Sequence, residues 1–207
     1  FSSIPGACVS VEVPVVPALA ASVMLMALLY WQWKRATGAA ALLSALGAGV
    51  VLLVTLAMAP LLSAPQLVML DVGQGDALAV TSRGRAVLVD AGEEDEMLLS
   101  ALARHNIRHL DAVIVTHSDK DHYGSLPALH PYVTVDAVYA YEGVRSCECE
   151  NCDQFRMAVG QLGCDLRGLS AGDVMQVGEV RLAVAGPERL SDKCGNDDSL
   201  CIVGTGA

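Results

Sequence analysis

The chain has 207 residues, enough for one domain with an appendage, and 53% of them are apolar while only 17% are charged. This composition excludes a disordered chain, which would be poor in apolar residues, and it disfavours a wholly soluble globule. The formal net charge of −10 disfavours a protein that coats nucleic acid with a basic surface.

The first 64 residues are the apolar part of the chain, with one acidic and two basic side chains. Residues 13–33 and 39–62 carry no charge, and each run exceeds the roughly 20 apolar residues that a membrane-spanning helix needs. We therefore expect a two-helix transmembrane hairpin at about 13–33 and 39–62. A signal peptide and a buried soluble hairpin are the alternatives, but a signal peptide would carry its basic residues ahead of the apolar core.

The basic side chains of this part are Lys34 and Arg35, which lie between the two runs. Positively charged loops tend to stay in the cytoplasm. We therefore expect a multi-pass protein of the cell membrane, with the part after Pro65 on the outer face. The chain opens at Phe1 and not at an initiator Met, so we also expect a fragment of a longer protein.

Residues 66–207 hold the remaining 22 acidic and 11 basic side chains and predict a separate α/β domain. Short β-rich runs interrupted by Gly and Asp are typical of strands joined by tight turns. Strands are predicted at 66–71, 77–81, 86–90, 111–116, 133–140, 174–177, 180–185 and from 200 onward. Helices are predicted at 93–105, which begins with acidic residues as the helix dipole favours, and at 153–163, which ends at a glycine.

The strongest chemical signal follows the strand predicted at 111–116. His117, Asp119, Asp121 and His122 fall within six residues there. A loop at that position can turn all four side chains toward one point, and mixed nitrogen and oxygen ligands suit Zn²⁺, Mn²⁺ or Fe. A bound divalent cation lowers the pKa of its water to about 7 and so generates a hydroxide nucleophile. The alternative is a solvated polar loop with chance histidines, which so compact a pattern disfavours.

The pattern His-x-Asp-x-Asp-His resembles the metallo-β-lactamase superfamily signature His-x-His-x-Asp-His, with Asp119 in place of the middle histidine. Residues 70–77 and 88–92 resemble the first two sheet-edge motifs of one branch of that superfamily, and residues 196–200 resemble a further element of it. This branch is the ComEC family, the membrane channel for DNA uptake in bacterial competence, in which membrane spans immediately precede such a domain. The resemblance implies a metallo-β-lactamase-like αββα sandwich behind the transmembrane hairpin.

The resemblance also implies roles for the four side chains of the motif. His117 and Asp119 would bind one metal ion, and Asp121 and His122 would bind a second, with Asp121 as the catalytic residue. The cofactor would be a divalent metal, Zn or Mn.

Five further polar residues would support this site. Asp71 and Asp76 belong to the first sheet-edge motif, Asp90 ends the next strand, and Asn196 and Asp197 open the last motif. Carboxylates at such positions can orient a metal ligand from behind. Turn chemistry and hydrogen bonds at strand ends are the other explanation for all five.

The family pattern continues with a Thr-Gly-Asp element and a Gly-His-His-Gly-Ser element that complete the metal shell, and neither occurs up to Ala207. A hydrolytic metal needs roughly three protein ligands plus water. We therefore expect the sandwich to be incomplete at its C-terminus and the 207-residue chain to be inactive by itself.

A second cluster contains Cys147, Cys149 and Cys152. The spacing Cys-x-Cys-x₂-Cys could bind Zn²⁺, with Cys164 or Cys194 as a fourth ligand. It could equally form disulfides in an oxidising compartment, and this is the interpretation that the expected outward topology favours. Unpaired loop thiols are the third alternative.

Three functions follow from these patterns. The first is a membrane-anchored, metal-dependent hydrolase-like domain of a DNA-uptake channel, which would act on or near phosphodiesters of incoming DNA and have the membrane, DNA and the rest of the channel as partners. The second is a general metallo-hydrolase of a small ester or lactam. The third is a non-catalytic assembly module of the channel, because a fold does not by itself determine a function.

Overall fold

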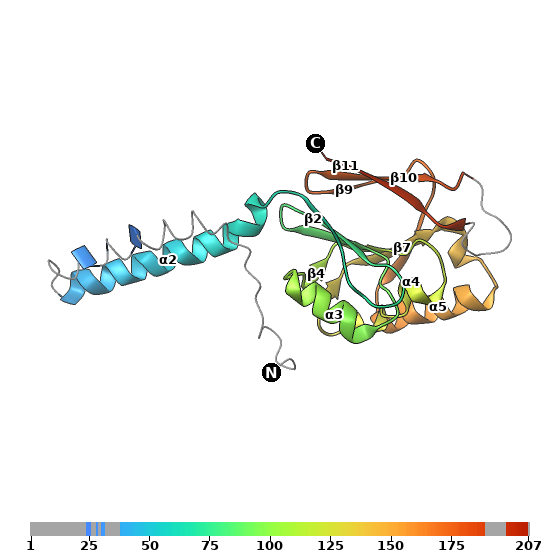
Figure 1. Ribbon diagram of the computed structural model, residues 1–207, viewed down its shortest axis with the longest axis horizontal. Helices are drawn as coiled ribbons and strands as arrows, with labels where there is room; N and C mark the ends of the chain where they lie inside the picture. The colour runs from blue at the N-terminus through green and yellow to red at the C-terminus, as the bar shows by residue number, and fades with distance from the viewer. Residues whose placement is uncertain (1–23, 26–27, 29, 32–37, 189–197, 207) are drawn as a thin grey trace. The chain divides into compact units, whose positions relative to one another are not determined.

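The computed structural model describes residues 24–25, 28, 30–31, 38–188 and 198–206 (Figure 1). Its contacts divide the chain into two units, one within Val11–Leu62 and the other containing Ser63–Ala207. Each unit is described by itself.

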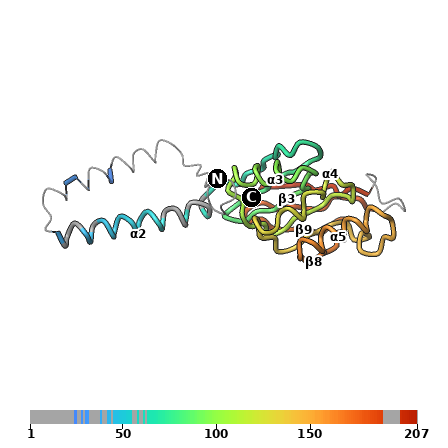
Figure 2. Tube along the Cα trace, turned by 90° about the horizontal axis from the view of Figure 1, so that it is seen from below, coloured from blue at the N-terminus to red at the C-terminus, as the bar shows by residue number. Residues whose placement is uncertain are grey.

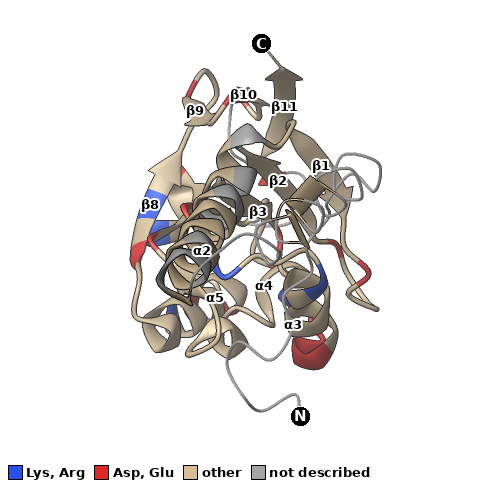
Figure 3. Ribbon diagram, turned by 90° about the vertical axis from the view of Figure 1, so that its left-hand side faces the viewer, with Lys and Arg blue, Asp and Glu red and all other residues tan. Residues whose placement is uncertain are grey.

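The first unit contains helix α2 (Gly38–Leu62), whose 25 residues include no charged side chain (Figure 3). Large apolar side chains stand exposed along it: Leu42, Leu43, Leu46, Val50, Val51, Leu52, Leu53, Val54, Met58 and Leu61. Among the described residues, however, no helix is long and apolar enough to cross a membrane. Most of the first predicted span lies outside the described residues, so the transmembrane hairpin is not shown by the structure.

The second unit is built on a six-stranded sheet with the order β1-β2-β3-β5-β7-β8. Its strands are β1 (Gln66–Met69), β2 (Leu78–Ser82), β3 (Arg85–Val89), β5 (Ala112–Ile114), β7 (Ala137–Tyr141) and β8 (Asp165–Leu169). The first three strands form an antiparallel meander, and β3, β5, β7 and β8 run parallel to one another. The carboxyl ends of β1, β3, β5 and β7 therefore meet at one edge of the sheet.

A smaller antiparallel sheet has the order β11-β10-β9, with β9 (Val174–Val177), β10 (Val180–Gly186) and β11 (Cys201–Gly206). The backbone N–H of Glu179, in the turn between β9 and β10, donates to Ser82 Oγ at 2.9 Å and ties this sheet to the end of β2. An apolar cavity of about 230 Å³ lies between the sheets, lined among others by Val80 and Val89 from one and Leu182 and Ile202 from the other.

Helices α3 (Asp95–Arg104), α4 (Lys120–Tyr123) and α5 (Glu150–Leu162), with the 3₁₀ turns η1 (Pro127–Leu129) and η2 (Glu142–Arg145), complete the unit. They lie on the side of the large sheet away from β9–β11 (Figure 1), and Figure 2 views the molecule from that helical side. Phe155 of α5 is fully buried and packs edge-on against Tyr123, with 5.2 Å between ring centroids. The described part of the unit thus has three of the layers of the predicted sandwich.

The predicted elements of residues 66–207 are found with small shifts at their ends, apart from two differences. The strand predicted at 133–140 is divided at Asp136, because β6 (Thr134–Val135) pairs with β4 (His109–Leu110) in a separate two-stranded sheet while β7 pairs with β5. Strand β8 was not predicted, because Asp165, Arg167 and Gly168 interrupt its apolar character; it forms by pairing with β7.

The turn between β1 and β2 packs directly on the loop that carries the predicted metal ligands. Gly75 has a φ of +89°, and a Cβ atom built on it would overlap the backbone carbonyl of Asp121. Only glycine permits both this backbone conformation and this close approach. The segment Gly73–Asp76 therefore forms one wall of the 117–122 loop.

Replacing Gly75 with Ala should destabilise the domain more than replacing Gly172, whose φ is +96° but whose surroundings are open within 4 Å. Both substitutions incur the left-handed backbone cost of roughly 1–2 kcal/mol, and only Gly75→Ala also displaces Asp121. Thermal unfolding followed by circular dichroism measures the difference. Equal midpoints for the two variants would show that Gly75 does not pack against the loop.

Candidate metal centre

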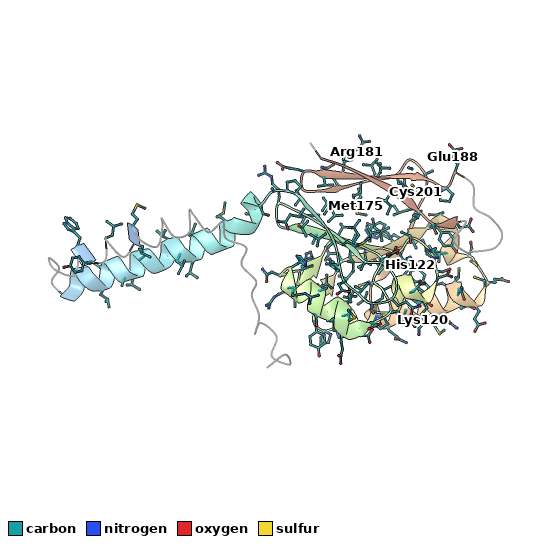
Figure 4. All side chains as sticks on the ribbon, in the orientation of Figure 1. Lys120, His122, Met175, Arg181, Glu188 and Cys201 are labelled. Atoms are coloured by element: carbon teal, nitrogen blue, oxygen red, sulfur yellow. The ribbon has the colours of Figure 1, made fainter. Side chains whose placement is uncertain are left out.

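The predicted metal-binding side chains lie where β5 meets the common edge of the large sheet. Val115 directly follows β5, and its backbone N–H donates to the Tyr139 carbonyl of β7 at 2.8 Å. His117 comes two residues later and is buried, with 6% of its surface exposed, and His122 lies on α4. On the same helix, Lys120 is turned toward the outer surface, with 67% of its side chain exposed against 14% for His122 (Figure 4).

The four side chains form two pairs. His117 Nε2 lies 3.5 Å from Asp119 Oδ2, and His122 Nε2 lies 3.8 Å from Asp121 Oδ2. The two imidazoles adjoin, with 4.0 Å between ring centroids and 51° between ring planes. These are the two pairs that the sequence resemblance implies for two metal ions.

Asp90 holds this arrangement from behind. It is 4% exposed, and its Oδ1 accepts a hydrogen bond from the Thr116 backbone N–H at 2.8 Å, while its Oδ2 accepts one from Thr116 Oγ1 at 2.8 Å. The same Oδ2 lies 2.9 Å from His122 Nδ1. A carboxylate at this distance keeps the ring proton on Nδ1, which leaves Nε2 free as a ligand atom directed to Asp121.

The two histidines have opposite protonation tendencies. Burial, followed by the charge of His122, lowers the pKa of His117. The hydrogen bond to Asp90 is the largest cause that raises the pKa of His122 above its ordinary value. The lowered pKa of His117 favours its neutral imidazole, which is the form that can bind a metal, and the raised pKa of His122 favours its protonated form.

The chemistry of this donor set fits a divalent cation. It offers two imidazole nitrogens and two carboxylates, each carboxylate partly exposed at the mouth of the site. Nitrogen ligands suit zinc, and carboxylates raise the share of harder ions such as manganese. Asp90 supplies the outer carboxylate that commonly orients a metal-binding histidine.

The remaining predicted supporting residues have different positions. The Asp76 carbonyl accepts a hydrogen bond from the Gly92 N–H at 3.1 Å, which joins the first turn to the end of β3. Asp71 is exposed near the same edge. Asn196 and Asp197 lie outside the described residues, but the neighbouring Leu200 N–H donates to the Thr116 carbonyl at 2.9 Å.

Two residues of the site were not predicted as such. Thr116 Oγ1 contacts Asp90 and also lies 3.1 Å from His117 Nδ1, and its position directly before His117 was the available signal. Asn151 Nδ2 donates to Asp119 Oδ1 at 3.0 Å. It is 32 residues away in the chain, and no local pattern connects it to the site.

The cysteines of the second cluster converge in part. The Sγ atoms of Cys147, Cys149 and Cys152 lie within 4.8 Å of one another. Cys164 does not join them, because it lies beyond the C-terminal end of α5. That end of the helix is roughly 15 Å from Cys152 along the helix axis. There the Cys164 thiol contacts the Val135 carbonyl. In this structure Cys164 therefore lies apart from the other three cysteines. Burial raises the pKa of the Cys152 thiol to about 11.

Several solved structures are similar to the chain. A diphosphatase from the PhnP family is 17% identical, covering 54% of this chain and 42% of its own, with a TM-score of 0.40. The Rm3 metallo-beta-lactamase is 19% identical over 62% and 53%, with a TM-score of 0.45. Zn²⁺-bound PqqB from Methylobacterium extorquens is 17% identical over 55% and 42%, with a TM-score of 0.41.

A curated relative and a family model match the domain by sequence. ComE operon protein 3 of Bacillus subtilis (strain 168) is 28% identical over 155 residues, which is 65% of this chain and 20% of that protein. The chain thus spans about a fifth of this relative. Residues 70–147 match the metallo-beta-lactamase superfamily model, and they include β2, β3, β5 and the whole 117–122 loop. The unit that follows α2 therefore has a metallo-beta-lactamase-like α/β fold, and its residues 70–147 are similar to that superfamily.

Proposed function

We propose that this domain is a metal-dependent hydrolase-like domain of a membrane channel for DNA uptake, and that it acts on phosphodiesters of incoming DNA. The observation that carries the proposal is the pairing of His117 with Asp119 and of His122 with Asp121 in front of a buried carboxylate. The likeness to ComE operon protein 3 supports the assignment to a competence-related channel.

The residues of the chain would prepare the site for Zn²⁺ or Mn²⁺. A divalent cation supplies Lewis acidity, which favours ionisation of water and polarises a phosphoryl oxygen. Asp90 holds the proton of His122 on Nδ1 and Asn151 holds one oxygen of Asp119, so that the remaining ligand atoms stay directed to the mouth of the site. Asp121, with 39% of its side chain exposed, would contact both the cation and the substrate.

The acidity of the domain limits how DNA could bind. Non-specific affinity for DNA comes largely from Lys and Arg, and residues 66–207 hold 22 acidic but only 11 basic side chains. Near the site, Lys120 Nζ donates a hydrogen bond to Glu93 Oε1 at 2.6 Å. A bound divalent cation is then the main positive charge available to a phosphodiester, so DNA binding should depend on metal.

We further propose that the domain is anchored to the cell membrane and lies on its outer face. The support comes from the two uncharged runs at 13–33 and 39–62 and from the basic pair Lys34 and Arg35 between them. A general metallo-hydrolase of a small ester or lactam is the second candidate, which the metallo-beta-lactamase superfamily match favours.

Asp121→Asn should lose most Mn²⁺ binding while the domain still folds, because the amide is nearly isosteric but carries no charge. Asp90→Asn should weaken Mn²⁺ binding by about 10- to 100-fold, the usual effect of removing an outer carboxylate. Manganese is chosen because thiolates select softer ions. Titration followed by the electron paramagnetic resonance of free Mn²⁺ measures both affinities.

Asp165→Asn is the matched control, because that carboxylate is 79% exposed on β8, distant from the loop. It should bind Mn²⁺ as the unmodified chain does. Unchanged affinity in Asp121→Asn would remove Asp121 from the ligand set, and a similar loss in Asp165→Asn would mean that binding is only diffuse surface charge.

A fluorescent DNA oligonucleotide should bind the chain only when Mn²⁺ or Zn²⁺ is present, and Asp121→Asn should abolish this metal-dependent part. A methylphosphonate oligonucleotide, which lacks the phosphate charge, should not bind. Fluorescence anisotropy measures binding, and nitrocefin turnover tests the lactam alternative in the same samples. Nitrocefin hydrolysis without DNA binding would favour the general hydrolase, and metal binding with neither would favour the assembly module.

In intact cells, a membrane-impermeant maleimide should label the chain at Cys201, which is exposed on β11. The reason is the outward placement that Lys34 and Arg35 imply. Cells that produce a Cys201→Ser variant identify the part of the signal due to this residue. Labelling of Cys201 only after lysis would reverse the proposed topology.

A further inference from the structure

Three thiols meet at the start of α5, apart from the histidine and aspartate pairs. Cys147 and Cys149 lie in the segment before the helix, and Cys152 lies in its first turn. The Sγ atoms of Cys147 and Cys149 are 3.1 Å apart, and all three sulfur atoms fall within 4.8 Å of one another. The sulfur atoms are thus already gathered about a single point.

The burial of the three thiols differs in a way that suits a ligand site. Cys152 is fully buried, where its sulfur lies 3.0 Å from the Tyr141 hydroxyl and 3.5 Å from Ser118 Oγ. Cys147 and Cys149 are half-buried and can be reached from solvent. The Cys152 sulfur is therefore fixed in the protein interior, and the sulfur atoms of Cys147 and Cys149 lie nearer the surface.

We propose that Cys147, Cys149 and Cys152 form a second metal site, a three-thiolate site for Zn²⁺ or a similarly soft divalent ion, with water in the fourth position. Zinc–sulfur bonds of about 2.3 Å in a tetrahedral site place sulfur atoms about 3.8 Å apart, close to the separations found here. The proton of each thiol leaves to solvent as its sulfur binds the ion.

A disulfide is the competing outcome, and the outward topology favours oxidising conditions. A disulfide joins two sulfur atoms and leaves the third unused. The convergence of all three, with the buried Cys152 among them, is the arrangement that a metal uses in full. The chemistry of the cluster therefore points to a soft metal ion.

This site would also position the ligands of the first. Asn151, next to Cys152, donates to Asp119, and Cys152 contacts Ser118 between His117 and Asp119. A metal ion that fixes the start of α5 would fix these two contacts. The thiolate site is therefore a structural support for the 117–122 loop, and its existence does not depend on the proposed function.

Cobalt(II) titration of the reduced chain tests the proposal, because cobalt bound to thiolates gives a charge-transfer absorption in the near ultraviolet that nitrogen and oxygen ligands do not give. One equivalent of Co²⁺ should produce this band, and Zn²⁺ should abolish it by displacement. Cys147→Ser and Cys149→Ser should each lose most of the band. Cys164→Ser and Cys201→Ser are the matched controls and should retain it.

The readout separates this site from the proposed hydrolytic one. Asp121→Asn should leave the cobalt–thiolate band unchanged, and Cys149→Ser should leave a Mn²⁺ site that is weakened but present. Absence of the band in the reduced chain would overturn the proposal, as would a band that persists in both Cys147→Ser and Cys149→Ser. A thiol count showing that two of the three sulfur atoms re-form a disulfide in the presence of Zn²⁺ would establish the competing outcome.

Discussion

The candidate site depends on one buried carboxylate. Asp90 directly follows β3 and has a φ of +58°, a conformation that costs a non-glycine residue free energy, and it is 4% exposed. A buried charge is tolerated only when it is fully hydrogen-bonded. Two donors from Thr116 and the ring of His122 provide this compensation, so the need to satisfy Asp90 is also what brings the loop after β5 over the end of β3.

The local features of the fold and of the site could be predicted from the sequence, because each has a signal within a short stretch of the chain. The 117–122 motif, the acidic start of α3 and the glycine that ends α5 are all read within a few residues. Parallel pairing of β3 with β5 then places Asp90 beside Thr116. The division of the 133–140 run at Asp136 depended on β4, a partner strand 25 residues earlier, which no local pattern reveals.

Contacts across the chain explain what sequence reasoning missed in the site. Asn151 reaches Asp119 over 32 residues, and Ser118 reaches Cys152 over 34. Both arise because Phe155 and its neighbours on α5 pack beneath the loop, a consequence of tertiary packing alone. The same packing separates Cys164 from the other cysteines, although the sequence spacing allowed it to join them.

The charge of the domain favours a metal-centred function over broad electrostatic binding. An acidic surface repels a polyanion at long range, whereas a contact made in a partly buried site is less screened by salt. The carboxylates at the mouth of the site, Asp119 and Asp121, would repel a phosphodiester unless a cation lay between them and it. Under the proposed function, recognition of DNA would therefore require the ion first, because the carboxylates that would attract the ion would repel DNA in its absence.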